Sequence, residues 1–365
     1  MFLIAWRNLF GEKGRLFITI GGVAFAVTLI LVILGLYLGW QVQMTRFLGG
    51  IDTDLWVGQQ GSKDLTHSLS ILPTELESKL ANIEGVKSVV PFVSRQVSFE
   101  IDGKEAHLNF IGDDGSGTVK PYKLTQGTAN LSSQEIVVDE TFAQDKKVVI
   151  GDTLKIDDIN FKIVGLAKGG NMIVYTFALM RLDDLRAILD FSNNNNYYLV
   201  KSDQPELAEK NISSEINSVL VMGRQEFLDN NAAIVRDSFL PIAGVLLIIA
   251  IAIGVAVIGL TIFTSTIEKS REYGVLKAIG YTSSGLYGIA LIQSLVSGVI
   301  GFVIGYFLSL VVVEVAQRAA SGFVHEVTTI NVMWVLVLTI FMSILASFIP
   351  LQRLSTIDPA KIFKA

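Results

Sequence analysis

Four long apolar stretches run through the chain, and none of them contains a charged residue. They cover residues 17–40, 239–265, 285–313 and 332–350. A helix crosses the hydrocarbon core of a bilayer with about 20 apolar residues, because it rises about 1.5 Å per residue. Each stretch therefore predicts one membrane-spanning helix, and the chain is expected to cross a membrane four times.

Residues 1–16 mix apolar and basic positions ahead of the first apolar stretch. Their apolar side chains recur every three or four residues, which is the spacing of one helix face: Phe2, Leu3, Trp6, Leu9 and Phe10. This predicts an amphipathic helix lying in the cytoplasmic membrane interface. The alternative is a basic flank that only anchors the first span. The stretch 17–40 is too long for a signal peptide and lacks a small-residue cleavage site, so we expect it to be retained.

Residues 41–236 differ in character, because short alternating segments lie between polar segments with helical spacing. Asp102-Gly103 separates two alternating segments, a pattern typical of a β-hairpin. Helices are expected at 73–80, 182–189 and 204–219. Strands are expected at 96–101, 105–111, 135–139, 153–156 and 161–165. The pattern predicts an α+β domain that is large enough to bury its own core.

Composition supports this division of the chain. Charged residues make up 17% of the sequence and hydrophobic residues 51%, whereas soluble domains carry about 25% charged residues. The predicted fold class is an α-helical membrane protein with four transmembrane helices, one plus three, and a large α+β extracytoplasmic domain between the first and the second. The absence of cysteine excludes disulfides, thiolate metal sites and a cysteine nucleophile. The net charge of −5 argues against nucleic acid as a partner.

Charge is distributed unevenly between the segments that flank the spans. Residues 1–16, 266–284 and 351–365 together contain nine Lys and Arg and four Asp and Glu, a net charge of 9 − 4 = +5. The total of −5 leaves −5 − 5 = −10 for the rest of the chain. Cytoplasmic flanks are enriched in Lys and Arg. Both termini and segment 266–284 are therefore expected in the cytoplasm, with domain 41–236 and loop 314–331 outside.

The sequence offers no recognisable catalytic motif. It lacks the G-x-x-x-x-G-K-[ST] phosphate-binding loop and the H-E-x-x-H zinc motif, and its three histidines are far apart. The glycine-rich segment 112–117 has neither the nucleophile-elbow nor the dinucleotide-binding order. We therefore predict no catalytic, cofactor-binding or metal residues. The spans also lack the buried ionisable groups expected of a proton- or sodium-coupled transporter.

Small residues recur at near-helical spacing along stretch 285–313: Ser294, Gly298, Gly301 and Gly305. Small side chains let helices approach closely. They indicate either packing within one chain or an interface with a second copy, and the sequence leaves both readings open.

The charged segment between the second and third spans carries a resemblance to a known family. Glu268-Lys-Ser-Arg-Glu-Tyr-Gly-Val-Leu-Lys-Ala-Ile-Gly280 resembles the E-K-x-R-E-[IYF]-G-[TV]-L-[KR]-A-[IL]-G pattern of MacB/FtsX-type ABC transporter permeases. Ala5-Trp-Arg-Asn-Leu9 is similar to the opening of that family, and Asp358-Pro-Ala-Lys-Ile362 to its tail. The order of one span, a large outer domain and three spans is also the family's. Unlike MacB itself, the chain has no fused ATPase.

The resemblance implies a dimeric permease of the type VII class, more readily a homodimer than a heterodimer, in a bacterial cell membrane. Two copies of a separate cytoplasmic ABC ATPase would bind ATP, so this chain would hold no cofactor and have no enzymatic activity. ATP-driven motion would reach a MacB-like periplasmic core domain through the helices, which is termed mechanotransmission. A periplasmic adaptor is an open further partner. Within the core domain, residues 73–111 would belong to a βαβ-like part.

The same resemblance gives segment 266–280 the role of a coupling helix that grips the ATPase. The residues expected to carry this role are Glu268, Arg271, Glu272, Tyr273, Gly274, Leu276 and Lys277. Tyr273, Val275, Leu276 and Ile279 are expected to form one apolar face. The alternative is a solvated turn whose charges only set the topology.

Three activities remain open at this point. The first is export of an amphiphile such as a peptide, haem or an antibiotic, and the second is extraction of lipoproteins or lipids. The third is regulation of a cell-wall hydrolase in the manner of FtsX. A hypothesis of another class is a membrane-anchored ligand sensor, which would need neither an ATPase nor the charges of 268–280.

Overall fold

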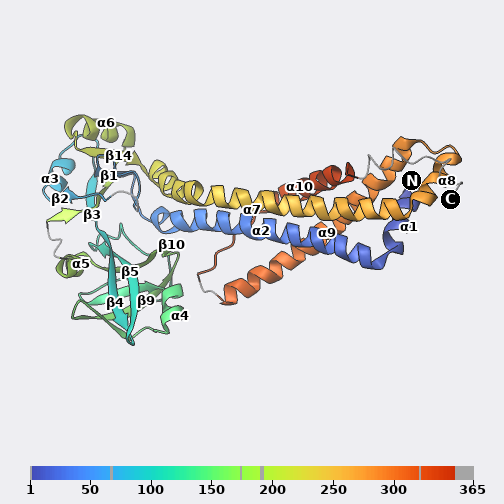
Figure 1. Ribbon diagram of the computed structural model, residues 1–365. Helices are drawn as coiled ribbons and strands as arrows, with labels where there is room; N and C mark the ends of the chain where they lie inside the picture. The colour runs from blue at the N-terminus through green and yellow to red at the C-terminus, as the bar shows by residue number, and fades with distance from the viewer. Residues whose placement is uncertain (1, 66–68, 173–174, 190–192, 320–321, 350–365) are drawn as a thin grey trace. The chain divides into compact units, whose positions relative to one another are not determined.

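The computed structural model describes residues 2–65, 69–172, 175–189, 193–319 and 322–349 (Figure 1). The tail 351–365, with its resemblance at Asp358–Ile362, lies outside these residues. The chain forms two compact units. A helical unit comprises Met1–Leu38, Phe239–Ala319 and His325–Ala365, and an outer unit comprises Gly39–Ser238 and Ala320–Val324.

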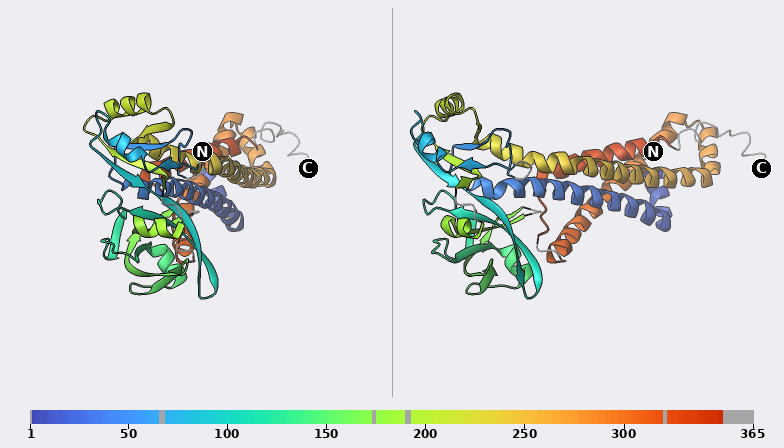
Figure 2. Two further views of the ribbon diagram at one scale, coloured as in Figure 1. Left: turned by 90° about the vertical axis from the view of Figure 1, so that its left-hand side faces the viewer. Right: turned by 60° about the vertical axis from the view of Figure 1, so that its left-hand side comes forward.

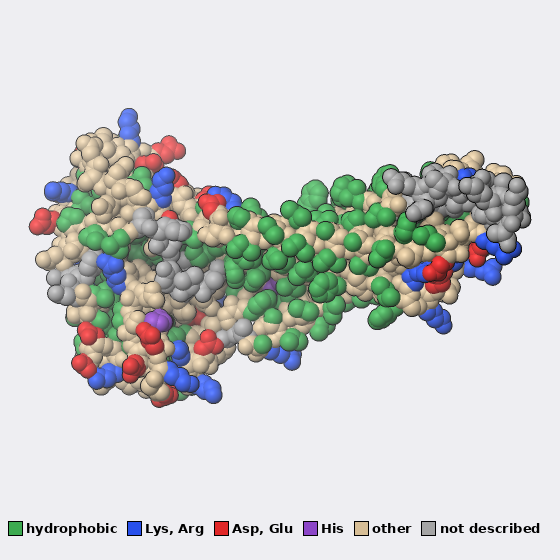
Figure 3. All heavy atoms as spheres, viewed as in Figure 1, with side chains coloured by type: hydrophobic (Ala, Val, Ile, Leu, Met, Phe, Trp, Pro, Cys, Tyr) green, Lys and Arg blue, Asp and Glu red, His purple; other side chains and the backbone are tan. Residues whose placement is uncertain are grey.

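Within the described residues, four helices are long and apolar enough to cross a membrane. They are α2 (Lys13–Gly49), α7 (Arg224–Glu268), α9 (Ser283–Ala319) and α10 (Thr329–Ser347). Hydrophobic side chains cover the visible face of the helical unit (Figure 3). The fold class is therefore the one predicted, with four membrane helices and an α+β domain between the first and the second.

The helices do not end where the apolar stretches end. The expected domain boundaries at residues 41 and 236 lie inside α2 and α7, which continue through polar residues such as Gln41 and Arg236. Hydropathy marks the thickness of the hydrocarbon layer, whereas polar side chains outside it are compatible with a continuing helix. For the same reason α9 extends to Ala319 and α10 begins at Thr329, inside the expected loop 314–331.

Two short helices lie next to the long ones. Helix α1 (Phe2–Gly11) is followed after one residue by α2, and α8 (Ser270–Ala278) follows α7 after one residue. The expected segment 266–284 is thus divided among the end of α7, the helix α8, a turn and the start of α9. The membrane parts of α2 and α7 lie side by side in both views of Figure 2. Their backbones approach closely at Gly22, where a methyl group would overlap the side chain of Val257.

The outer unit contains a four-stranded sheet in the order β14-β1-β13-β3 and an eight-stranded sheet. The larger sheet has the order β4-β5-β11-β7-β9-β6, with β10 paired to β11 and β8 to β9. The strands of the smaller sheet are β1 (Leu55–Gln59), β3 (Ser88–Phe92), β13 (Tyr197–Lys201) and β14 (Val219–Gly223). Those of the larger are β4 (Ser94–Ile101), β5 (Lys104–Asp113), β6 (Lys123–Gly127), β7 (Glu135–Asp139), β8 (Thr153–Ile156), β9 (Ile159–Lys168), β10 (Asn171–Met172) and β11 (Tyr175–Arg181).

Helices cover each sheet through buried apolar side chains. Helices α3 (Leu76–Ala81) and α6 (Pro205–Glu215) pack Leu80 and Ile212 onto the four-stranded sheet. Helices α4 (Glu140–Lys146) and α5 (Leu182–Leu189) do the same for the larger sheet with Phe142 and Leu185. Among the described residues, the four-stranded and the eight-stranded sheet thus each have a hydrophobic core.

The predicted hairpin is present, because β4 and β5 pair antiparallel around Asp102-Gly103. Both turn residues have positive φ, 52° and 71°, as a two-residue turn of this kind requires. Two helix predictions were wrong at their ends. Pro73 belongs to strand β2 (Leu72–Pro73), which pairs with β12 (Asn194–Asn195), and the helix predicted at 204–219 ends at Glu215 before β14 begins. Residues 73–111 are distributed among three sheets rather than forming one βαβ unit.

Candidate coupling site

Helix α8 is a nine-residue helix with a break on each side. Lys269 interrupts the helix at the end of α7, with φ −93° and ψ 16°. At the other end Gly280 has φ 100° and turns the chain, so that Tyr281 N donates to Leu276 O at 2.9 Å. Glycine suits this position because it adopts positive φ without steric cost. The breaks set α8 apart from the membrane helices before and after it.

The two faces of α8 have different surroundings. Tyr273 is 3% exposed in the core of the helical unit, and Leu276 packs against the same core. Val275 and Ile279 are 42% and 73% exposed. The expected single apolar face is therefore wrong, because Tyr273 and Leu276 pack into the core whereas Val275 and Ile279 are exposed. One face anchors α8, and the other is available.

The remaining predicted coupling residues divide along the same line. Arg271 and Glu272 are exposed beside the face that carries Val275, whereas Gly274 is buried beside Tyr273. Lys277 is partly buried, and Glu268 is the last residue of α7. Val275 and Ile279 are the exposed apolar residues that the predicted site set omitted. Their four-residue spacing was the signal that could have distinguished them.

Four charged side chains tie the two helix breaks together. Arg15 Nη2 lies 2.8 Å from both carboxylate oxygens of Glu268, and Arg15 also pairs with Glu12. Lys269 Nζ lies 3.1 Å from Glu12 Oε1. We call Glu12, Arg15, Glu268 and Lys269 the ion quartet. In the sequence these four charges indicate only the topology of the chain, and their contact with one another was not predicted.

A small cavity of about 20 Å³ lies next to the quartet. Glu12 and Arg15 line it together with Thr19, Ser265 and Gln293. Gln293 is 4% exposed, and Ser297 at the cavity wall is 1% exposed. These uncharged polar side chains continue the polar environment of the quartet into the helical unit.

The small residues of α9 face neighbours in the same chain. A Cβ at Gly301 would lie 2.6 Å from Val23 of α2, and one at Gly305 would lie 2.8 Å from Val27. Gly298 faces Ser343 of α10, and buried Ser294 donates to Leu291 O at 2.9 Å. These positions account for close packing within one chain, and a further role at a dimer interface stays a prediction.

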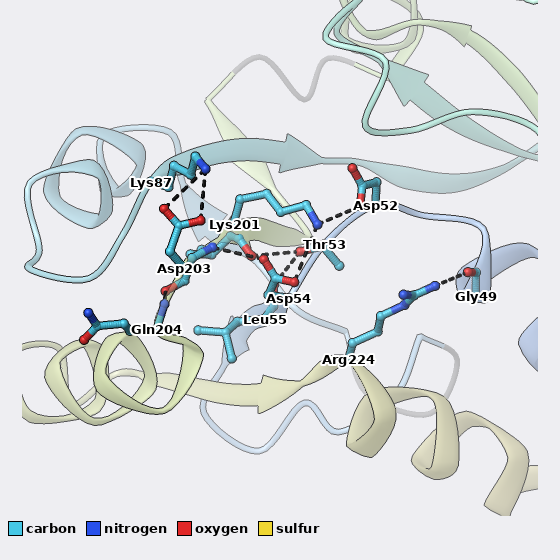
Figure 4. Close-up of polar contacts among 12 residues, drawn as sticks. Gly49, Asp52, Thr53, Asp54, Leu55, Lys87, Lys201, Asp203, Gln204 and Arg224 are labelled. Carbon is cyan, nitrogen blue, oxygen red and sulfur yellow. Dashed lines mark hydrogen bonds and ion pairs between the residues drawn. The ribbon is translucent and has the colours of Figure 1, made fainter.

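In the outer unit, polar contacts join the end of α2 to the start of α7 (Figure 4). The Arg224 guanidinium donates to Gly49 O, and Arg224 N donates to Asp54 O at 3.0 Å. Asp54 Oδ2 in turn accepts from Ser202 N at 3.0 Å. Lys201 Nζ lies 2.6 Å from Asp52 Oδ1, and this hydrogen bond holds the pKa of the Asp52 carboxyl below its usual value.

An aromatic cluster strengthens the same junction. Phe227 of α7 stacks on Trp56 of β1 with ring centroids 4.1 Å apart, and both side chains are fully buried. Tyr197 packs edge-on against Phe227 at 5.3 Å and donates its hydroxyl to Asp64 O. Buried Asn231, one turn further along α7, accepts from Leu65 N at 3.1 Å. The first turns of α7 are therefore fixed to the four-stranded sheet by packing and by hydrogen bonds.

The described residues contain no group of three His, Asp or Glu side chains that could hold a metal ion. The buried carboxylate of Asp139 caps α4, accepting from Thr141 N at 2.8 Å and from Gly170 N at 2.9 Å. Burial raises the pKa of Asp139 above its usual value. Its hydrogen bonds give this residue a structural role.

These features define a class: a multi-pass membrane protein with an extracytoplasmic α+β domain between its first two membrane helices. Residues 16–215 match the MacB-like periplasmic core domain, and residues 244–359 match the FtsX-like permease C-terminal domain. The chain belongs to the MacB/FtsX-type ABC transporter permeases. Membership implies a membrane location and an ABC ATPase as partner.

Related proteins carry permease names. An uncharacterized ABC transporter permease of Mycobacterium tuberculosis is 24% identical over 379 residues, covering 100% of this chain and 99% of that protein. A Staphylococcus epidermidis protein that bears the name hemin transport system permease HrtB is 23% identical over 98% of this chain and 97% of its own. For an uncharacterized permease of Methanocaldococcus jannaschii, 23% identical, the match covers 60% of this chain and 59% of the relative.

Among solved structures, the periplasmic region of MacB from Actinobacillus actinomycetemcomitans aligns with 49% of this chain and 92% of its own, at 16% identity and a TM-score of 0.38. The extracellular domain of the ABC-type transporter YknZ from Gram-positive bacteria aligns with 47% of this chain and 100% of its own, at 15% identity and a TM-score of 0.36.

Proposed function

We propose that this permease couples ATP hydrolysis by a separate cytoplasmic ATPase to motion of its outer domain. One observation carries the proposal: α7 is a single helix from Arg224 in the aromatic and polar junction to Glu268 beside α8. At about 1.5 Å per residue, a helix of 45 residues is about 68 Å long. Pro241 removes one backbone hydrogen bond within α7, but the helix continues on both sides of it, so a displacement at one end can act at the other.

The exposed face of α8 supports the contact with the ATPase. It combines Val275 and Ile279 with the charges of Arg271 and Glu272 in a helix whose opposite face is anchored. A short helix with such a face binds by lying in a groove of its partner. Charges of both signs give the contact an orientation, and exposed apolar side chains gain from burial.

Two copies of the permease would bind two ATPase subunits, with both termini and α8 in the cytoplasm. The charge distribution supports this orientation, because the segments around α8 and the N-terminus are the basic ones. A homodimer is the simpler arrangement, and an adaptor outside the membrane would be a further partner. In this arrangement the chain itself has no enzymatic activity and holds no cofactor, since ATP binds to the ATPase.

We further propose an amphiphile such as a peptide, haem or an antibiotic as the exported substrate. Spans free of charged residues favour handling of a substrate outside the membrane over passage of a hydrophilic one between the helices. The name of the staphylococcal relative supports haem within this class. Lipid or lipoprotein extraction and control of a cell-wall hydrolase are the alternatives, and a sensor without an ATPase is the alternative of another class.

Co-purification tests the proposal. The full tagged chain is expected to retain a nucleotide-binding subunit in detergent and to stimulate its ATP turnover. Arg271→Glu with Glu272→Lys should reduce the retained ATPase at least tenfold, because both side chains lie on the available face. Glu314→Arg with Arg318→Glu is the matched control, since it reverses an exposed pair of α9 far along the chain from α8. Full retention of the ATPase by the α8 variant would contradict the proposal.

A further inference from the structure

The ion quartet links two places where the chain leaves a helix. Glu12 is the single residue between α1 and α2, and Lys269 is the single residue between α7 and α8. Arg15 and Glu268 lie beside them, at the start of α2 and at the end of α7. The Glu12 carboxylate contacts two cations, Arg15 and Lys269. The Glu268 carboxylate contacts Arg15 through both of its oxygens.

The quartet is more enclosed than an ordinary surface ion pair. The side chains of Lys269, Arg15 and Glu12 are 16%, 23% and 29% exposed, whereas that of Glu268 is 61% exposed. A partly buried pair gains more from attraction than an exposed one, because water screens it less. Loss of one partner also leaves the other charge uncompensated in a poorly hydrated place.

The direction of α8 depends on this contact. The side chain of Lys269, at the N-terminal cap position of α8, makes no capping hydrogen bond, and its carbonyl accepts from Tyr273 N at 3.0 Å. Tyr273 and Leu276 fix the inner face of α8 in the apolar core. The pairing of Lys269 with Glu12 supplies a second point of attachment, on the other side of the break.

We propose that Glu12 and Arg15 are positioning residues that hold α8 on the α1–α2 corner, so that α1 and α8 move as one body during the ATPase cycle. This rests on the proposed function, and it adds α1 to the part of the permease that follows the ATPase. The quartet stays closed throughout the cycle and fixes the angle at which the available face of α8 meets its partner. The contact surface for the ATPase remains on α8.

Charge reversal and its repair test the proposal in the complex of the full chain with its ATPase, in lipid nanodiscs. Arg15→Glu and Glu268→Arg should each lower ATP turnover at saturating ATP at least fivefold, with the ATPase still bound and KM for ATP within twofold. The double variant should recover turnover to within twofold of the unmodified complex. The matched control is the exposed pair Glu314 and Arg318, 2.7 Å apart, whose reversal should change nothing. Unchanged turnover in both single variants, or no recovery in the double variant, would overturn the proposal.

A second measurement covers variants that fold poorly. The chain has no cysteine, so Arg15→Cys with Glu268→Cys can be bridged selectively with a short bis-maleimide. Bridging should raise ATP turnover towards that of the unmodified complex, because it replaces the lost ion pair by a covalent link. A fall to the basal rate would mean that the quartet must open, and would overturn the proposal. If the unmodified chain retains no ATPase at all, the proposed function itself fails, and this result is distinct from both others.

Discussion

At the scale of single residues, the packing of α9 against α2 gives a sharp expectation at Gly301. A Cβ there would lie 2.6 Å from Val23 Cβ, which is part of a stiff branched side chain. Overpacking of this kind costs about 1–3 kcal/mol, more than the gain of up to about 1 kcal/mol from replacing glycine by alanine in a helix. Gly301→Ala should therefore lower the unfolding temperature in detergent. Gly21→Ala in α2 is the control, because open space surrounds that position, and equal behaviour of the two variants would refute the packing argument.

Asp139 predicts a pH dependence with a definite sign. Burial raises the pKa of its carboxyl in the folded state above its usual value. The folded state then binds more protons than the unfolded one between the two pKa values, so stability is lost as pH rises through the folded pKa. Each unit of pKa shift corresponds to about 1.4 kcal/mol. The unfolding free energy of Asp139→Asn, measured relative to the unmodified chain by denaturant titration, should rise from about pH 3.5 to about pH 7, because only the unmodified chain loses stability as its carboxyl ionises. If the difference in unfolding free energy between the two chains stays constant or falls over this pH range, ionisation of the Asp139 carboxyl does not destabilise the folded state.

Contacts between individual residues far apart in the chain could not be predicted from the sequence. The charges of Glu12, Arg15 and Glu268 were visible, but Arg15 and Glu268 are 253 positions apart and meet only because α2 and α7 pack together. The motif at 268–280 marked the segment that contains α8, and the coupling role of this segment stays a prediction. It could not separate Tyr273, held in the core, from Val275, exposed to solvent, because both are apolar and lie two positions apart.

At the scale of elements, the junction of α7 with the four-stranded sheet yields a further prediction. Phe227 is fully buried and stacks on Trp56, so Phe227→Ala leaves a cavity in the aromatic cluster. Truncation of a buried phenylalanine costs about 3–5 kcal/mol. We expect a loss of this size in the unfolding free energy of the outer unit. Unfolding can be monitored by the fluorescence of Trp56 once the other three tryptophans have been replaced by phenylalanine.

The same variant should lower ATP turnover without releasing the ATPase, since α8 is untouched. Val149→Ala is the control, because this side chain is 60% exposed and its loss should change stability by no more than about 0.5 kcal/mol. A Phe227→Ala chain as stable as this control would contradict the role of the cluster.

Some helices and strands of this chain could be predicted from the sequence, and others could not. The membrane-spanning helices were predicted because an apolar segment of about 20 residues rarely forms any other structure. Strands β1 and β13 were missed since they are buried on both faces, so they lack the alternation that identifies a half-buried strand. The ends of α2 and α7 were missed for a different reason: nothing in their polar continuation breaks a helix.

At the scale of the whole molecule, the orientation can be tested because the chain contains no cysteine. Asp102→Cys introduces a thiol at the exposed tip of hairpin β4–β5, and Ser284→Cys introduces one at the exposed start of α9. An impermeant maleimide should label the first in intact cells and the second only after permeabilisation, because the basic flanks favour the cytoplasm. Labelling of Ser284→Cys in intact cells, with Asp102→Cys labelled only after permeabilisation, would contradict the proposed topology.

The helical course of α7 from Arg224 to Glu268 has a consequence for how the permease can be altered. Each residue of a helix turns the chain by about 100°, so one residue inserted within α7 rotates one end relative to the other by that angle. Seven inserted residues make nearly two full turns and leave an offset of about 20°. The rotation of Arg224 relative to Glu268 about the helix axis therefore depends on the number of residues between them and on the local geometry at Pro241.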